Sequence, residues 1–113
     1  MKILLVDDNP KVRDMVKELA GNSANIFYEA SNGTEAVSLY KQHQPDIVVM
    51  DIEMEKMDGL IATRMIYDYD EKANVIVLTN HSDPFFREAA LRAGSHIFIE
   101  KNNMLSIRSL LCN

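Results

Sequence analysis

The chain has 113 residues, of which 47% are hydrophobic and 26% are charged, and its formal net charge is -5. This length suits one domain with a real hydrophobic core, and the composition is that of a soluble globular protein rather than a disordered one. The acidic balance argues against direct nucleic-acid binding, because a phosphate backbone attracts a basic face. It suits a domain that recruits a cation or a basic partner surface.

Secretion, membrane insertion and disulfide bonding are not expected. The single cysteine, Cys112, excludes an internal disulfide and offers no metal cluster. The apolar run at residues 3–6 is too short for a signal peptide, and no segment approaches the length of a membrane span. We therefore expect a cytoplasmic domain that does not contact a membrane.

Four short, nearly continuous apolar runs indicate buried strands. They are residues 3–6, 47–50, 75–78 and 97–99. Continuous rather than alternating hydrophobicity is typical of a parallel sheet that is covered on both faces. Residues 26–30, with the sequence IFYEA, are more mixed and predict an edge strand.

Helical patterns follow the strands, and the first and fourth predicted helices begin alike. Asn9 can cap the first helix, and Ser82 or Asp83 can cap the fourth, each just before a proline. Gly94 predicts the end of the fourth helix. The residues of these two helices expected to face the core are Val12, Met15, Val16, Leu19, Ala20, Phe86, Ala89, Ala90 and Ala93.

The other helices have weaker signals. Thr34 can cap a second helix that carries Leu39 and Tyr40, and Asp58 can cap a third. Core-facing residues are expected at Ile61, Ala62, Met65 and Ile66 in the third helix, and at Met104, Ile107, Leu110 and Leu111 in a short last helix. Five strand–helix units in succession predict a three-layer α/β domain with a parallel sheet.

Polar residues follow the buried strands. Right-handed crossovers bring every strand end that leads to a helix to one edge of the sheet, where ligands bind in such folds. If the first and third strands are neighbours, three carboxylates face one another there. The strand-end residues are Asp7, Asp8, Asp51, Thr79, Glu100 and Lys101.

Three crowded carboxylates either raise one another's pKa or share a cation. An all-oxygen pocket with room for water suits magnesium. One of the carboxylates can then act as a nucleophile that forms an acyl phosphate, with a lysine and a hydroxyl to receive the phosphoryl oxygens.

Five sequence pieces in this order resemble the receiver domain of two-component response regulators, over essentially the whole chain. They are LLVDDNP, PDIVVMDIEMEKMDG, VIVLT, ALRAG and IFIEK. The resemblance implies a doubly wound (βα)5 domain with three α-β-α layers, whose five-stranded parallel sheet has the flavodoxin-like order 2-1-3-4-5. It also implies a receiver domain over residues 1–113; a cut-out from a longer regulator and a stand-alone regulator are both left open.

The resemblance implies roles for the strand-end residues. Asp51 would be the phosphoacceptor, phosphorylated by a sensor histidine kinase or a phosphotransfer protein. Asp7, Asp8, Asp51 and the backbone carbonyl of Glu53 would hold Mg2+, with Mn2+ as a substitute. Lys101 would pair with the phosphoryl group. The domain would catalyse only its own phosphorylation and dephosphorylation and would not be a turnover enzyme.

The resemblance also implies a switch. Thr79 would hydrogen-bond the phosphoryl group and Phe98 would rotate inward with it, which would move the face made by the fourth helix, fifth strand and fifth helix. This face would act on an output domain or partner protein, with transcriptional regulation as the expected output, and could support a homodimer. The Glu53 side chain and His81 would modulate hydrolysis.

Three residues depart from the family pattern. Glu55 stands where a proline is usual, so that loop is expected to be less rigid. Asn102 follows Lys101 where the family often has a proline after a cis bond, and a cis bond before a non-proline residue costs roughly 3 kcal/mol. Asn80 is bulkier than the small residue common after the threonine and is expected to slow phosphoryl access.

Two alternatives use the same residues differently. A phosphohydrolase of the haloacid-dehalogenase type also needs a strand-end aspartate, a threonine, a lysine and magnesium. It would want an aspartate two residues after the nucleophile, where this chain has Glu53. A receiver-like docking module that no longer uses phosphate is the other alternative, and the departures at residues 55, 80 and 102 keep it open.

Overall fold

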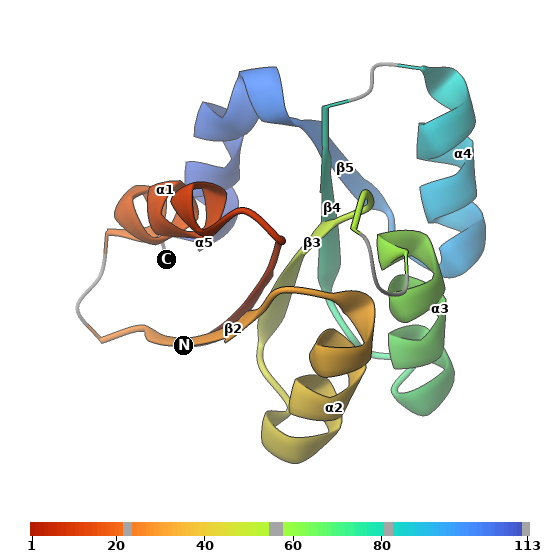
Figure 1. Ribbon diagram of the computed structural model, residues 1–113, viewed down its shortest axis with the longest axis horizontal. Coiled ribbons are helices and arrows are strands. Elements are labelled where there is room, and N and C mark those ends of the chain that lie inside the picture. Colours follow the sequence, from red (N-terminus) through yellow and green to blue (C-terminus); the bar gives the residue numbers. More distant parts are fainter. Residues whose placement is uncertain (22–23, 55–57, 81–82, 112–113) are drawn as a thin grey trace.

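Five parallel strands form one sheet at the centre of the protein, with helices on both faces (Figure 1). The computed structural model describes residues 1–21, 24–54, 58–80 and 83–111. The strand order is β2-β1-β3-β4-β5, which confirms the predicted doubly wound topology. The strands are β1 (Lys2–Val6), β2 (Ile26–Ala30), β3 (Ile47–Asp51), β4 (Val75–Thr79) and β5 (Ile97–Glu100).

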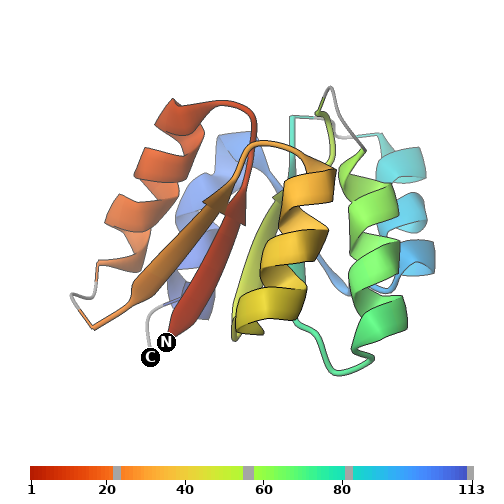
Figure 2. The same cartoon turned by 60° about the horizontal axis from the view of Figure 1, so that its bottom comes forward.

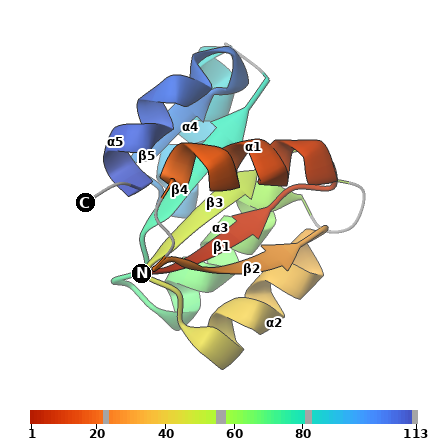
Figure 3. The same ribbon diagram turned by 90° about the vertical axis from the view of Figure 1, so that its left-hand side faces the viewer.

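The helices divide into two layers. The elements between and after the strands are α1 (Pro10–Ala20), α2 (Gly33–His43), α3 (Gly59–Tyr69), α4 (Pro84–Ala93), the 3-10 helix η1 (Lys101–Ile107) and α5 (Arg108–Leu111). Figure 3 shows α1 and α5 on one side of the strands and α2 on the other. Strands β1 and β2 point to the same edge, where their connections to α1 and α2 begin (Figure 2).

Each face of the sheet has its own hydrophobic core. Leu4, Val48 and Val77 point toward α2, α3 and α4 and pack with Tyr40, Ala62, Ile66 and Ala90. The alternate strand residues Leu5, Val49 and Leu78 point toward α1 and α5 and pack with Val16, Ala20, Ile107 and Leu111. Burial on both faces explains why the strands lack polar alternation.

Most predicted helix boundaries are confirmed. The side chains of Asn9, Asp58 and Asp83 cap α1, α3 and α4, and each accepts a backbone hydrogen bond from the residue two positions later. Ser82 lies outside the described residues. Gly94 ends α4 in the left-handed region, with φ 113°.

The cap predicted at Thr34 is wrong. Helix α2 begins two residues earlier, because the Asn32 side chain accepts a hydrogen bond from the Glu35 backbone N–H at 2.9 Å. Thr34 therefore lies within the first turn. An asparagine is at least as good an N-cap as a threonine, so the earlier start is physically reasonable.

Three residues expected in the core are substantially exposed. Ile61 and Met65 are 55% and 39% exposed, because α3 turns Ala62, Thr63 and Ile66 toward the sheet instead. The buried Thr63 hydroxyl donates a hydrogen bond to the Gly59 carbonyl oxygen at 2.7 Å, which removes the cost of burying it.

Met15 is the third of these residues and is half exposed. It borders a groove of about 630 Å3 between α1 and η1 rather than the core. The groove forms where the chain after β5 runs through 3-10 turns before α5 begins, whereas the sequence predicted a simple short helix. Within the described residues, no helix is long and apolar enough to cross a membrane.

Candidate functional site

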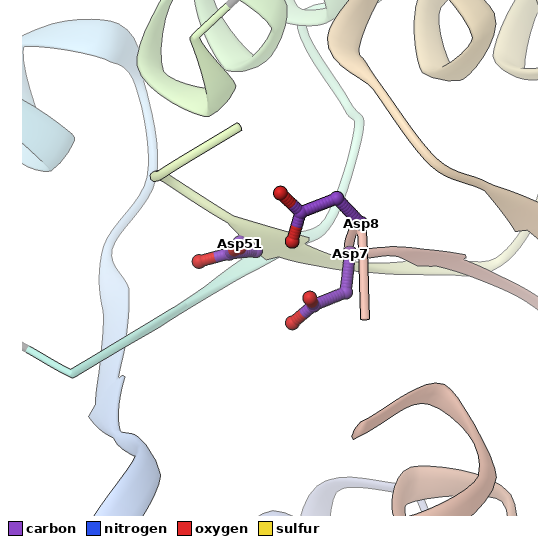
Figure 4. Close-up of side chains that lie close together, drawn as sticks. All are labelled: Asp7, Asp8 and Asp51. Atoms are coloured by element: carbon purple, nitrogen blue, oxygen red, sulfur yellow. The ribbon is translucent and has the colours of Figure 1, made fainter. Parts of the chain in front are cut away.

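Three carboxylates meet at the edge of the sheet where β1 and β3 end. Asp7 and Asp8 follow β1 directly, and Asp51 is the last residue of β3. One oxygen from each side chain lies within 4.8 Å of the others, and Figure 4 shows the three groups together. Asp7 and Asp51 are each only 3% exposed, whereas Asp8 is exposed.

The register of the parallel strands accounts for this meeting. Val6 of β1 is paired with Met50 of β3, so the next residues, Asp7 and Asp51, occupy adjacent positions beyond the apolar part of the sheet. Side chains alternate between faces along a strand, so both aspartates continue the rows that cover the α1–α5 face. The predicted convergence of these acids is confirmed.

Lys101 brings a cation to the same place. It follows β5, and its Nζ lies 3.0 Å from Asp7 Oδ2 and 3.5 Å from Asp51 Oδ1. Burial alone would lower the pKa of Lys101, but the Asp7 and Asp51 carboxylates outweigh burial and raise it above its usual value. The lysine is therefore a permanent cation between two buried acids.

The pKa of Asp51 is raised well above its ordinary value. Burial, followed by the charge of Asp7, raises the pKa of Asp51 to about 6, while Lys101 and the backbone N–H of Glu53 oppose the shift. That N–H donates to Asp51 Oδ1 at 3.3 Å. A carboxyl group with a strongly raised pKa beside a charged partner is typical of functional sites.

The two carboxylate oxygens of Asp7 have different partners. Its Oδ1 accepts a hydrogen bond from the Asn9 backbone N–H at 2.9 Å. Its buried Oδ2 lies 3.0 Å from Lys101 Nζ, which donates a hydrogen bond to this carboxylate within the ion pair. A hard divalent cation prefers oxygen ligands, so these three carboxylates fit one.

Thr79 and Phe98 lie near the site on the opposite face of the sheet. Asp51 is paired with Leu78, so Thr79 ends β4 one residue beyond it and is fully buried. Phe98 is paired with Val77 and packs with the core toward α2–α4. The alternation of strand side chains puts Thr79 and Phe98 on this face and the acids on the other.

Phe98 also contacts a cation. The Arg87 guanidinium of α4 lies 4.9 Å from the centre of the Phe98 ring, in a cation–π arrangement. The half-buried ring is thus held between the core and a charged side chain of the neighbouring helix.

The remaining predicted residues have mixed outcomes. The Glu53 side chain is exposed, while its backbone N–H contacts Asp51 as described. His81 and Glu55 lie outside the described residues. Asn80 is exposed, and no described peptide bond is cis, so Asn102 follows Lys101 through a trans bond.

Two residues of the site were not singled out in the sequence. Arg13 donates a hydrogen bond to the Asp7 carbonyl oxygen. Gly59 lies so close to the Asp51 backbone that a Cβ atom would come within 1.9 Å of the Asp51 carbonyl oxygen. A cation in the first turns of the helix after Asp7, and a glycine after the Asp58 cap, were the available signals.

Known proteins are similar to this chain in sequence and in fold. A family model described as the response regulator receiver domain matches residues 3–110. The chemotaxis protein CheY of Bacillus subtilis is 40% identical over 101 residues, which cover 88% of this chain and 84% of that protein.

Solved structures agree with the sequence comparison. A LuxR-family two-component response regulator from Aurantimonas sp. SI85-9A1 has a TM-score of 0.84 and 33% identity, with 97% of this chain and 84% of that chain covered. The CheX-CheY-BeF3-Mg+2 complex from Borrelia burgdorferi has a TM-score of 0.83 and 27% identity, with 100% and 90% covered. This chain, with its acid cluster at the edge of a five-stranded parallel sheet, belongs to the response regulator receiver domain family.

Proposed function

We propose that this protein, taken over residues 1–113 as one receiver domain of the cytoplasm, is a phosphorylation-dependent signalling switch in which Asp51 accepts the phosphoryl group. The observation that carries the proposal is the position of Asp51, which is buried at the end of β3 between a carboxylate cluster and Lys101. An acid in this environment is held in place, is mostly ionised near neutral pH because its pKa is about 6, and faces a cation that can receive transferred charge.

The reaction is an in-line transfer to a carboxylate. An oxygen of ionised Asp51 attacks the phosphorus of a phosphohistidine on a sensor kinase or phosphotransfer protein. A P–O bond forms, the P–N bond breaks, and the imidazole departs with the electron pair of that bond. Lys101 remains protonated and binds a phosphoryl oxygen. Its ion pair with the Asp51 carboxylate is thereby replaced by an ion pair with the phosphoryl group of the product.

The proposed site for Mg2+, with Mn2+ as a substitute, consists of Asp7, Asp8, Asp51 and the backbone carbonyl of Glu53. A bound divalent cation neutralises the crowded carboxylates and the incoming phosphoryl oxygens. The clustered carboxylate oxygens of the three aspartates support this assignment. The solved CheX-CheY-BeF3-Mg+2 complex is a similar fold that contains magnesium and a fluoroberyllate.

Thr79 and Phe98 are the proposed link to the signalling face. Thr79 lies at the same sheet edge as Asp51, from which its hydroxyl can turn toward a phosphoryl oxygen. The space that the Thr79 side chain would leave lies on the face of the sheet where Phe98 packs, so the Phe98 ring could rotate into it. The α4–β5–α5 face then changes its affinity for an output domain, a partner protein or a second copy. A role in transcription is supported by the similarity to a LuxR-family regulator.

Membership of the receiver family sets aside the haloacid-dehalogenase alternative. The exposed Glu53 side chain also differs from the aspartate that such an enzyme needs two residues after its nucleophile. The phosphate-independent docking module is distinguished from a phosphoryl switch by experiment.

The test is intact mass after incubation with a small-molecule phosphodonor, with and without Mg2+. We expect wild type to gain one phosphoryl group only with Mg2+, and Asp51→Asn to gain none. Asp58→Asn is the matched control, because Asp58 is an exposed acid whose cap to Leu60 an asparagine can retain. A folded wild-type protein that gains no phosphoryl group from the small donor or from a histidine kinase would favour the docking module.

A further inference from the structure

Arg13 of α1 connects the edge strand β2 to the backbone beside the acid cluster. Its Nη1 donates a hydrogen bond to the Asp7 carbonyl oxygen, and its Nε donates to Glu29 Oε1 at 2.9 Å. The Arg13 side chain is 16% exposed, so it is held in the structure rather than free in solvent.

Glu29 is a fixed anchor for this arginine. It also accepts from Lys17 Nζ, at 2.6 Å from Oε2. The hydrogen bond from Lys17, together with that from Arg13, lowers the pKa of Glu29 despite its partial burial. The carboxylate is therefore ionised at neutral pH and orients the guanidinium through a charge-assisted hydrogen bond.

The clamped carbonyl belongs to the peptide bond between Asp7 and Asp8. A peptide unit is planar, so fixing its oxygen fixes the direction in which the chain continues from one acid to the next. The Asp7 backbone N–H is held separately by the Ala30 carbonyl oxygen at 3.1 Å. Asp7 is thus restrained on both sides of its Cα, and the start of Asp8 is restrained with it.

We propose that Arg13 is a positioning residue that clamps the Asp7–Asp8 peptide and so preorganises the two carboxylates for a divalent cation. The inference rests on the proposed function. Partners that orient metal ligands typically change metal affinity about 10- to 100-fold when they are removed. Lysine cannot replace the clamp, because the planar fork of arginine reaches two acceptors at once.

The charge of Arg13 makes the test decisive. Removing a positive charge near three carboxylates strengthens cation binding if electrostatics alone acts. The proposed clamp predicts the opposite, because removal of Arg13 should weaken cation binding. A purely structural arginine would change the stability of the fold without changing Mg2+ affinity.

The experiment is calorimetric titration of Mg2+ into wild type, Arg13→Gln, Arg13→Lys and Lys11→Met at pH 8 and constant ionic strength, with urea unfolding of each variant. Lys11→Met is the matched control, because Lys11 is an exposed cation of the same helix and lies outside the cluster of Arg13, Glu29 and Lys17. We expect both Arg13 variants to bind Mg2+ about tenfold more weakly than wild type. Lys11→Met should stay within about twofold of the wild-type Mg2+ affinity, since the loss of one solvent-exposed charge has a small effect.

The possible results distinguish failure of the clamp from failure of the proposed function. Unchanged or tighter Mg2+ binding in folded Arg13 variants overturns the clamp, as does an equal loss in Lys11→Met. If Arg13→Gln does not fold, Arg13→Lys, which keeps the charge, decides in the same way. Absence of Mg2+ binding by wild type overturns the proposed function and the inference together, whereas normal wild-type binding with unchanged variants overturns the inference alone.

Discussion

At the scale of single residues, the Asp51 carboxyl group is the centre of the electrostatic balance. Burial and the charge of Asp7 raise its pKa to about 6, against the attraction of Lys101. A folded-state pKa above the ordinary value of 3.8 means that the folded protein binds the proton more tightly than the unfolded chain. Ionised Asp51 therefore lowers the free energy of unfolding as pH rises from about 4 through about 6.

Asp51→Asn should remove this cost. We expect the variant to be more stable than wild type at pH 8, by about 1–2 kcal/mol once solvent screening at the sheet edge is allowed for. The difference should disappear near pH 4, where wild-type Asp51 is protonated. Urea unfolding at both pH values checks this, with Asp58→Asn as the control for losing an exposed negative charge. If Asp51→Asn is less stable than wild type at pH 8, the conclusion that ionised Asp51 destabilises the fold is wrong.

Lys101 is expected to hold the Asp51 pKa down. Lys101→Met removes the nearby cation, so the titration midpoint of the Asp51 carboxyl carbon should rise above about 6 by roughly one unit or more. Carboxyl-carbon NMR of metal-free protein measures it. Lys72→Met, at an exposed position in the turn before β4, controls for the change in net charge. A midpoint that stays or falls would show that Lys101 does not act on Asp51 in solution.

At the scale of elements, the start of α3 is packed against the end of β3. Gly59 donates its backbone N–H to the Ile52 carbonyl oxygen at 3.2 Å, and an added Cβ would lie 1.9 Å from the Asp51 carbonyl oxygen. The contact is with backbone, which cannot rotate away. The glycine therefore sets how closely α3 approaches the end of β3.

Gly59→Ala should destabilise the protein by about 2–4 kcal/mol, as expected for overpacking against a rigid neighbour. Gly21→Ala is the comparison, because its φ of 61° costs about 1 kcal/mol but its Cβ would meet only ordinary contacts. Thermal unfolding of both variants shows which of the two loses more stability. A Gly59→Ala protein as stable as Gly21→Ala would mean that α3 can shift without disturbing Asp51.

The helices also show where sequence reasoning succeeds and fails. Caps at Asn9, Asp58 and Asp83 are local hydrogen bonds, so the sequence revealed them. The rotation of a helix about its axis is set by the sheet that it covers. For this reason Ile61 and Met65 proved exposed although their spacing is helical, while Thr63 satisfies its hydroxyl inside the helix and lies buried.

At the scale of the whole molecule, the strand order of the sheet determines which strand ends lie close together. The order β2-β1-β3-β4-β5 puts β1 and β3 side by side in the centre, so acids distant in sequence become neighbours. The sequence predicted Asp7, Asp8, Asp51 and Lys101 as a group because each follows a recognisable buried run. It did not predict Arg13, because the approach of α1 to β2 depends on packing that no local pattern encodes.

Metal binding should couple this site to global stability. A ligand that binds only the folded state stabilises it by about 2.7 kcal/mol at 100 times its dissociation constant. We expect Mg2+ to raise the melting temperature at pH 8, and much less at pH 5, because protonated Asp51 is a poor ligand and its pKa is about 6. Calorimetric scans at matched ionic strength test this. An equal shift at both pH values would place the cation elsewhere.

The central claim is that Asp51 itself forms the acyl phosphate. The most direct measurement is borohydride reduction of protein treated with a phosphodonor and Mg2+, followed by peptide mass mapping, because borohydride converts an aspartyl phosphate to homoserine. The account predicts homoserine at position 51, only when Mg2+ was present, and unmodified Asp7 and Asp8. Homoserine at another aspartate, or at none in a protein that remains folded, would contradict it.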